Sequence, residues 1–321
     1  MRTPRTSILA AAALSLVTVA ARAETPLDRA VALFEQRQYA QSAALLADVV
    51  AAEPGNARAH AYYGLALTNS KRDLDGAITH LEKAASLDPG SSRYQVWLGS
   101  VYVAKAGQSG LLKAASLAGK GKAAFEKAVA LDPSSVEARQ ALLQYYLLAP
   151  GVAGGSVGKA REQAAAIGAL DPHRGHLAAA RIAEYEEEWQ AAEAAYREAL
   201  TLQPDRGATF NSLGYLLLRG KRVDEALAAF RRYVELSPGD ANAHDSLGEG
   251  LLAAGKVAEA EASYRRAVEV DPSFASSVWG LADCLDRLGR SDEAKAQYRR
   301  YLELVPKGGN SDAARKRLAK P

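Results

Sequence analysis

The stretch from residue 241 to residue 272 reads ANAHDSLGEGLLAAGKVAEAEASYRRAVEVDP and contains the pattern that decides the fold. It ends in a proline that belongs to an evenly spaced series, with 34 residues from each member to the next: Pro204, Pro238, Pro272 and Pro306. Prolines at 54, 89, 133 and 172 continue the series less evenly toward the N-terminus. Self-similarity at a fixed period of this size indicates an architecture built from repeated supersecondary units.

Each proline of the series is expected to end a helix. Proline lacks a backbone N–H and disfavours helical geometry in the residue before it, so the helix preceding Pro272 should stop there. The next helix should begin just beyond, because Asp240 and Ser273 are placed to accept the free N–H groups of the following first turn. The sequence therefore predicts repeats of two helices each and no strands.

Between the prolines, small and large apolar residues recur at fixed positions, and this pattern resembles the tetratricopeptide repeat. In the quoted stretch the residues on that family's signature positions are Leu247, Gly248, Leu251, Ala260, Tyr264, Ala267 and Pro272. The physical basis of the signature is that a glycine or alanine lets two helices approach closely where they cross, while the larger residue fills the space beside them. Matching residues recur in 207–238 and 275–306.

The resemblance covers nearly the whole chain beyond its N-terminal segment. It implies an all-α fold, a right-handed superhelical solenoid of stacked antiparallel helix pairs. One repeat cannot bury its own apolar face, so neighbouring repeats must stack. A charged segment at 307–321 is expected to form a capping helix and tail at the C-terminal end. The eight expected repeats span residues 23–54, 57–89, 92–133, 136–172, 173–204, 207–238, 241–272 and 275–306.

Two of these repeats are longer than the pattern requires. The third holds about ten extra residues around 106–120, and the fourth holds about five within 149–158. Insertions between the two helices of a repeat usually emerge as loops. We therefore expect two loops here. We expect the loop at 149–158 to take part in recognition, because loops carry function disproportionately.

The N-terminal segment has the composition of a secretory signal peptide. Arg2 and Arg5 precede an uncharged apolar run at 8–21, and small residues flank Arg22 in the sequence Ala-Arg-Ala. The run is shorter than the ~20 residues that a membrane-spanning helix needs, and no later stretch is longer or more apolar. We expect residues 1–23 to be removed, the mature chain to begin near Glu24, and the protein to be periplasmic or secreted.

The charge balance argues against a nucleic-acid partner. The chain has 40 basic and 37 acidic residues, and loss of the three arginines of the signal peptide leaves the two signs equal. A nucleic-acid-binding surface would need a basic face to neutralise phosphates. No basic run with interleaved aromatic residues is present.

The sequence offers no catalytic constellation. A glycine-rich stretch at 153–160 superficially resembles a phosphate-binding loop, but Ala153 and Ala160 replace the required glycine and hydroxyl residue. His173 and His176 have helix-face spacing but match no metal motif, so a solvated or capping role is expected. Cys284 lies in an apolar helical pattern that indicates a core residue. We predict that the protein is not an enzyme and uses no cofactor or metal.

The resemblance implies adaptor proteins that hold an extended peptide or a partner helix in a concave groove. In that family the groove is lined by the first helix of each repeat. The residues that the resemblance places in the groove are Arg58, Arg93, Gln140, Gln144, Arg174, Arg181, Asn211, Tyr215, Asn242, Asp245, Glu249, Trp279, Asp283 and Asp286.

Two functional hypotheses follow from this set. The first is an exported scaffold for envelope assembly or secretion that binds a protein or peptide. Arginines dominate the early groove positions and carboxylates the late ones, which would orient a partner by charge and speed its encounter. The second hypothesis is a binder of a small ligand or a glycan strand, with Trp279, Tyr215 and the asparagines as contacts. The partner's identity and the oligomeric state stay open.

Overall fold

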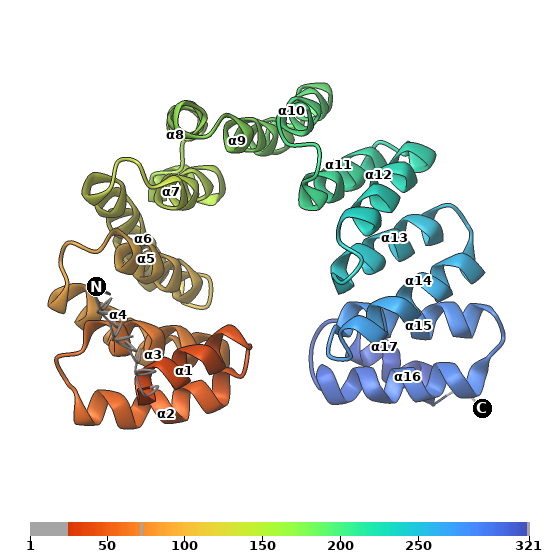
Figure 1. The fold of residues 1–321 in the computed structure, drawn as a ribbon, viewed down its shortest axis with the longest axis horizontal. Coiled ribbons are helices and arrows are strands. Elements are labelled where there is room, and N and C mark those ends of the chain that lie inside the picture. Colours follow the sequence, from red (N-terminus) through yellow and green to blue (C-terminus); the bar gives the residue numbers. More distant parts are fainter. Residues whose placement is uncertain (1–24, 71–72, 320–321) are drawn as a thin grey trace, which may run out of the picture. The chain divides into compact units, whose positions relative to one another are not determined.

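The computed structural model describes residues 25–70 and 73–319 (Figure 1). In these residues the regular secondary structure consists of seventeen α-helices and one 3₁₀ turn, without strands. The predicted all-α architecture of stacked helix pairs is therefore confirmed. None of the described helices combines the length and the apolar composition that crossing a bilayer requires. The expected signal peptide at 1–23 falls outside the described residues.

The helices follow one another in pairs, and we call the odd-numbered member of each pair the first helix and the even-numbered member the second helix. Helix α17 follows the last pair as a single short helix. The bounds are α1 Pro26–Glu35, α2 Tyr39–Ala52, α3 Ala57–Ser70, α4 Leu74–Leu87, α5 Ser92–Ala106, α6 Leu111–Leu131, α7 Val136–Leu148, η1 Gly151–Ala153, α8 Val157–Leu170, α9 Pro172–Tyr185, α10 Trp189–Leu202, α11 Gly207–Arg219, α12 Val223–Leu236, α13 Ala241–Ala253, α14 Val257–Val270, α15 Ala275–Arg287, α16 Ser291–Leu304 and α17 Ser311–Leu318.

The chain divides into two compact units, one ending at Pro89 and the other beginning at Gly90. In the first unit, α1 packs on α2, α2 on α3 and α3 on α4. The Ser42 hydroxyl donates to the backbone carbonyl of Ala30 at 2.8 Å, which satisfies a buried polar group where α1 and α2 cross. The second unit contains α5 to α17 and all but one of the predicted groove residues.

Close helix crossings in the second unit depend on glycines that face aromatic rings. A Cβ atom built on Gly214 of α11 would lie 2.5 Å from the ring of Phe230 on α12. On Gly248 of α13 it would lie 2.8 Å from the ring of Tyr264 on α14. Real Cβ atoms do not approach other atoms this closely, so these positions admit only glycine at the observed helix separation. The role that the sequence pattern assigns to glycine is thus visible in the packing.

The helix starts agree with the proline pattern at most positions, with two differences. Asp240 caps α13 by accepting from the Asn242 N–H at 3.0 Å. Ser273 does not cap α15 as expected, because its hydroxyl donates to Asp271 at 2.7 Å in the preceding turn. Pro172 does not precede a turn but is itself the first residue of α9, where its missing N–H leaves no unsatisfied donor.

The expected loop at 106–120 is mostly helix, so that prediction is wrong. Helix α6 begins at Leu111 and has 21 residues, whereas every other second helix has 14. The first ten residues of α6, LLKAASLAGK, are largely good helix formers without proline. They extend the second helix at its N-terminus and leave only a short connection at 107–110. The other insertion forms a loop at 149–156 that contains the 3₁₀ turn.

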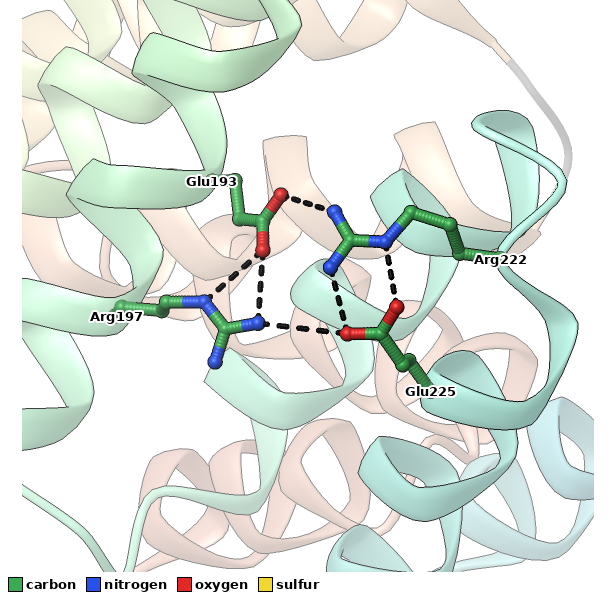
Figure 2. Close-up of polar contacts among 4 residues, drawn as sticks. All are labelled: Glu193, Arg197, Arg222 and Glu225. Carbon is green, nitrogen blue, oxygen red and sulfur yellow. Dashed lines mark hydrogen bonds and ion pairs between the residues drawn. The ribbon is translucent and has the colours of Figure 1, made fainter.

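An ion-pair cluster joins the second helices of consecutive repeats (Figure 2). Arg222, the N-cap residue of α12, binds Glu193 of α10 at 2.5 Å and Glu225 at 2.6 Å, and Arg197 also binds Glu193, at 2.7 Å. The same arrangement recurs 68 residues later between α14 and α16. Glu261, Arg265, Arg290 and Glu293 form it. Exposed ion pairs contribute little individually, but a network that recurs with the repeat fixes how neighbouring second helices align.

Helix α17 covers the apolar end of the last repeat. Ser311 and Ala314 are fully buried, and Leu318 packs on the same cluster as Tyr298 and Tyr301. The Ser311 hydroxyl is within 2.6 Å of the Val305 carbonyl, which anchors the start of the helix to the end of α16. The segment therefore has the contacts expected of a cap.

A valine at Gly214 should destabilise the protein by about 1–3 kcal/mol, because its side chain overlaps the ring of Phe230 and forces α11 and α12 apart. Urea unfolding followed by circular dichroism measures the change. The matched control is Gly239→Val, a turn position where no atom lies within 4 Å of the added Cβ. Equal stability of the two variants would contradict the crossing argument.

Deletion of residues 310–321 should lower the free energy of unfolding by at least about 2 kcal/mol, since the apolar end of α15 and α16 loses its cover. Thermal unfolding and sedimentation report on stability and on self-association. Lys316→Ala, which changes an exposed residue of the same helix, serves as the control. If the truncated chain had the same melting temperature as the intact chain, α17 would not be a cap.

Candidate partner-binding face

The first helices of the last repeats contact one another in order, α11 against α13 and α13 against α15. Their outward side chains therefore share one face, which we call the first-helix face. Polar contacts cross it at intervals close to the repeat length. His173 of α9 lies 3.4 Å from Thr209 of α11, Tyr215 of α11 contacts Glu249 of α13, and Asp286 of α15 pairs with Arg317 of α17. The repeat period places these residues side by side.

Tyr215 connects α11 to α13. Its hydroxyl donates to Glu249 Oε2 at 2.8 Å and lies 3.1 Å from the Ser246 hydroxyl. Its ring meets Phe230 edge-on, with centroids 5.1 Å apart. Burial raises the pKa of Tyr215, so its hydroxyl stays protonated and remains a donor to the carboxylate. Glu249 is itself exposed.

Asp245 lies beneath this face and not on it. Its side chain is only 5% exposed, and both oxygens accept from serines of the next first helix, Ser277 at 2.5 Å and Ser276 at 3.1 Å. Burial raises the pKa of Asp245, while these two hydrogen bonds act in the opposite direction. The residue predicted as a groove charge is therefore a buried link between α13 and α15.

A hollow of about 490 Å³ opens on the first-helix face between α13 and α15. Its polar lining includes the carboxylates of Glu249 and Asp283 and the hydroxyl of Ser276. Its apolar lining includes Trp279 and Tyr264. Three residues predicted for the groove thus lie around one concave site, which we call the carboxylate–tryptophan hollow.

Trp279 is held in place by two tyrosines. Its ring centroid lies 5.4 Å from that of Tyr298 and 5.5 Å from that of Tyr301, both from α16. Tyr301 also lines the hollow, and its hydroxyl accepts from the Asn310 N–H at 3.1 Å. These two ring contacts restrict the indole, which favours a preorganised contact.

The remaining late carboxylates already have cationic partners. Asp283 binds Arg287, one turn further along α15, at 2.8 Å. Asp286 pairs with Arg317 of the capping helix. Asp286 is therefore paired with the capping helix. Of the two acidic groups that line the hollow, Asp283 is paired with Arg287, and Glu249 accepts the hydrogen bond from Tyr215.

Two of the four early groove arginines already have acidic partners. Arg58, in the first unit, pairs with Asp28 at 3.1 Å, and Arg174 lies 3.6 Å from Asp171. Arg93 and Arg181 are exposed. The predicted contrast between a basic early half and an acidic late half is weakened, because several of its charges are already paired or buried.

The four amide residues of the predicted groove have separate environments. Asn242 donates to the Tyr233 hydroxyl at 3.3 Å, and the side-chain oxygen of Asn211 is buried without a hydrogen-bond partner. Gln140 is half-buried on α7, and Gln144 of the same helix lines a different, apolar hollow. None of them belongs to the carboxylate–tryptophan hollow.

Sequence reasoning missed Ser276, Tyr264 and Tyr301 as parts of this site. Tyr264 was visible only as a packing residue of the repeat signature, and Tyr301 belongs to a second helix that the groove model does not include. Contact of Ser276 and Ser277 with Asp245 could have been predicted from the sequence, because these serines follow Asp245 by about one repeat length.

The other candidate residues have structural surroundings. His173 is buried and contacts Thr209, so the expected solvated role is wrong for it, because the start of α9 is covered by α11. Cys284 is fully buried, as predicted, and burial raises the pKa of its thiol to about 12. Over 25–70 and 73–319, no three histidine, cysteine or carboxylate side chains come together as a metal site would need.

Comparisons with known proteins identify the architecture. A family model described as tetratricopeptide repeat matches residues 27–92, 177–241 and 246–309, which is more than half of the chain. The sequence has no significant match among curated proteins. The structure is similar to that of yeast Tom70, with a TM-score of 0.72 and 15% identity over 95% of this chain and 65% of that one.

A second similar structure is the APC/C hetero-tetramer Cut9-Hcn1, with a TM-score of 0.52 and 13% identity over 92% of this chain and 55% of that one. This chain spans less than two thirds of the length of either neighbour. At these identities the likeness shows the fold alone.

The buried Asp245 should give the stability a specific dependence on pH. An acid whose pKa is raised in the folded state binds more protons folded than unfolded, so its contribution to stability falls as pH rises above its ordinary value of 3.8. The free energy of unfolding of the wild type, minus that of Asp245→Asn, should therefore decrease between pH 3.8 and neutrality. Urea titrations at a series of pH values measure it.

Ser277→Ala is the informative companion variant, because it removes a hydrogen bond that lowers the pKa of Asp245. When Ser277→Ala is present, the difference in free energy of unfolding between the chains without and with Asp245→Asn should fall more steeply as pH rises. A difference between wild type and Asp245→Asn that is constant across this pH range would contradict the assignment.

Proposed function

The chain belongs to the tetratricopeptide repeat family, and from this premise we propose that it is a scaffold that binds a protein partner through its first-helix face, not a catalyst. The observation that carries the proposal is the carboxylate–tryptophan hollow. Its acidic groups and its aromatic ring face one cavity large enough for a side chain and its flanking backbone. The hollow is suited to a lysine or arginine side chain of an extended segment.

The chemistry of the lining supports a cationic guest. Glu249 offers an exposed carboxylate that Tyr215 orients, and Asp283 offers a second one on the neighbouring helix. Trp279 provides the aromatic face that attracts cations most strongly, an interaction of about 0.5–2 kcal/mol. Aliphatic stems of lysine and arginine can pack on the same ring while the charged end reaches the carboxylates.

The internal pair at Asp283 does not block the site. Arg287 is 54% exposed and lies one turn away on the same helix, and such pairs contribute about 0.3–0.5 kcal/mol. A guest cation enclosed in the hollow would be less screened than Arg287 is. A guest cation can therefore compete with Arg287 for Asp283, at the cost of its own desolvation.

A glycan strand is the alternative guest, and Trp279 favours it as well, because a flat ring beside carboxylates can also pack on a sugar. The two guests differ in their dependence on charge. A cationic side chain needs both carboxylates ionised and binds less well in salt, whereas a neutral sugar does not.

We further propose that this binding takes place outside the cytoplasm, in envelope assembly or secretion. This part of the proposal rests on the N-terminal sequence, which has a basic start, an apolar run and a small-residue cleavage site. Oxidising surroundings would not harm the fold, since its one cysteine is buried.

Neutralising the hollow should weaken binding of basic peptides. The variant Glu249→Gln with Asp283→Asn keeps side-chain shape and removes both charges, and we expect a loss of affinity of about ten-fold or more for an extended peptide with a central Lys-Arg pair. Fluorescence anisotropy of the labelled peptide, at low and physiological salt, measures it. The same peptide with a central Glu-Asp pair should bind poorly to the wild type.

Glu198→Gln with Glu303→Gln is the matched control, because both residues are exposed on second helices of the same unit. Equal losses in the two double variants would place the binding surface elsewhere. Binding of a chito-oligosaccharide that is unaffected by salt and lost in Trp279→Leu would favour the glycan alternative.

A further inference from the structure

The two insertions of the sequence meet in space at an apolar surface that is separate from the carboxylate–tryptophan hollow. A second hollow of about 630 Å³ lies between the end of α5, the N-terminal extension of α6, the end of α7 and the loop at 149–156. The 3₁₀ turn of that loop packs on α6. Both additions to the regular repeat therefore build the same feature, which we call the insertion hollow.

The surface around the insertion hollow is unusually apolar for an exposed region. Among the described residues, the four most exposed large apolar side chains are Val152 (101%), Leu112 (89%), Leu111 (87%) and Leu148 (67%). Three of them line the hollow, and Leu112 adjoins it in sequence. Exposed apolar residues that occur singly need no explanation, but a contiguous group of this size marks an interaction site.

Alanines such as Ala104, Ala115 and Ala118 line much of the hollow, together with the buried rings of Phe125 and Tyr145. Small side chains between these rings and the exposed leucines leave space that large apolar side chains of a partner can fill. A flat bilayer surface would reach Leu111 and Val152 but would leave the concave floor empty. The shape therefore favours a helix that inserts one apolar ridge.

The loop side of the hollow is preorganised. The Tyr145 hydroxyl donates to the Ala153 carbonyl at 2.7 Å, and the Ser156 N–H donates to the Tyr146 carbonyl at 2.8 Å. Gly154 has a φ of 90°, and a Cβ on Gly155 would lie 1.8 Å from the Ala149 carbonyl oxygen. The loop is thus tied down at both ends and takes a backbone path that only glycine permits, which lowers the entropy lost on binding.

Basic residues outnumber acidic ones beside the insertion hollow, although one of them, Lys122, pairs with Glu126 at 3.4 Å. Every charged residue between Asp88 and Glu126 is basic, and the same holds between Glu137 and Glu162. Lys105 and Lys113 adjoin lining residues in sequence, and Lys122 reaches the loop, with its Cδ 3.3 Å from a Cβ built on Gly154. The helix α6 also presents its N-terminus here, with Gly110 giving no side-chain cap. The surroundings of the hollow therefore favour acidic groups.

From these observations we propose that the insertion hollow is a second docking site, for an amphipathic helical segment of a partner with an apolar ridge and acidic flanks. The family model leaves residues 93–176 unmatched, and this span contains both insertions. The site therefore lies in a part of the chain that the family model does not match, and it goes beyond the partner binding proposed for the first-helix face.

The test uses the full chain and a labelled 18-residue peptide with leucines at i, i+4, i+7 and i+11 and glutamates on both flanks of that ridge. The peptide should bind the wild type and gain helicity. Its counterpart with lysines in place of the glutamates should bind at least about ten-fold more weakly. Leu111→Ser with Leu148→Ser and Val152→Ser should reduce affinity by about ten-fold or more.

Two further variants keep the result interpretable. Ala115→Phe fills the hollow and removes no exposed apolar residue, and it should also block the peptide. Leu202→Ser with Leu304→Ser removes exposed leucines elsewhere in the same unit and should have no effect. The Glu249→Gln, Asp283→Asn variant should bind this peptide normally, which separates the two proposals.

Three outcomes would overturn the proposal. The first is equal affinity of the acidic peptide for the wild type and the hollow variants, or no binding to either. The second is binding of the wild type to phosphatidylglycerol vesicles that needs Leu111 and Val152, without binding of the peptide. The third is self-association of the wild type that the triple serine variant abolishes, again without peptide binding, which would make a second copy the occupant.

Discussion

The packing of the second unit depends on aromatic rings that seat against glycines of two successive first helices. Tyr264 of α14 faces Gly248 of its own repeat and Gly280 of the next, where an added Cβ would lie 2.8 Å and 2.6 Å from the ring. Phe230 of α12 lies in the same way against Gly214 and Gly250. One ring thus sets both the crossing within a repeat and the stacking between repeats. Any side chain at these glycines would separate the helices, so the constraint applies at the two steps from α11 to α13 and from α13 to α15.

This constraint also positions the candidate site. Because Tyr264 holds α13 and α15 at a fixed separation, Glu249 and Asp283 come to face one hollow, and the ring itself forms part of the lining. Hydrogen bonds between the first helices also hold α13 against α15, because Asp245 accepts from Ser276 and Ser277 beneath the surface. Asp245 and Ser277, which support the fold, are therefore buried close to Glu249 and Asp283, which line the hollow and would bind a partner.

The two insertions show that a repeat protein can add residues where no glycine–ring crossing restricts the helix separation. An extension at the N-terminus of α6 leaves its crossing with α5 intact, where Gly99 and Gly121 keep the two helices close. The added turns are then free to form a surface with the loop at 149–156. A repeat protein can in this way acquire a docking site without disturbing the face that its other repeats share.

The sequence by itself determined the all-α fold, the helix pairs and the crossing glycines, because these follow from a 34-residue period and from steric rules that act within one repeat. The same period put Glu249, Trp279 and Asp283 among the predicted groove residues, and in the structure these three line one hollow. The sequence could not show that Asp245 is buried, that Asp286 is paired with Arg317, or that 111–120 is helix and not loop. Burial and pairing arise between residues about 31 positions apart in different helices. Only the tertiary structure decides which of them meet, because a small rotation of one helix exchanges an exposed charge for a buried one.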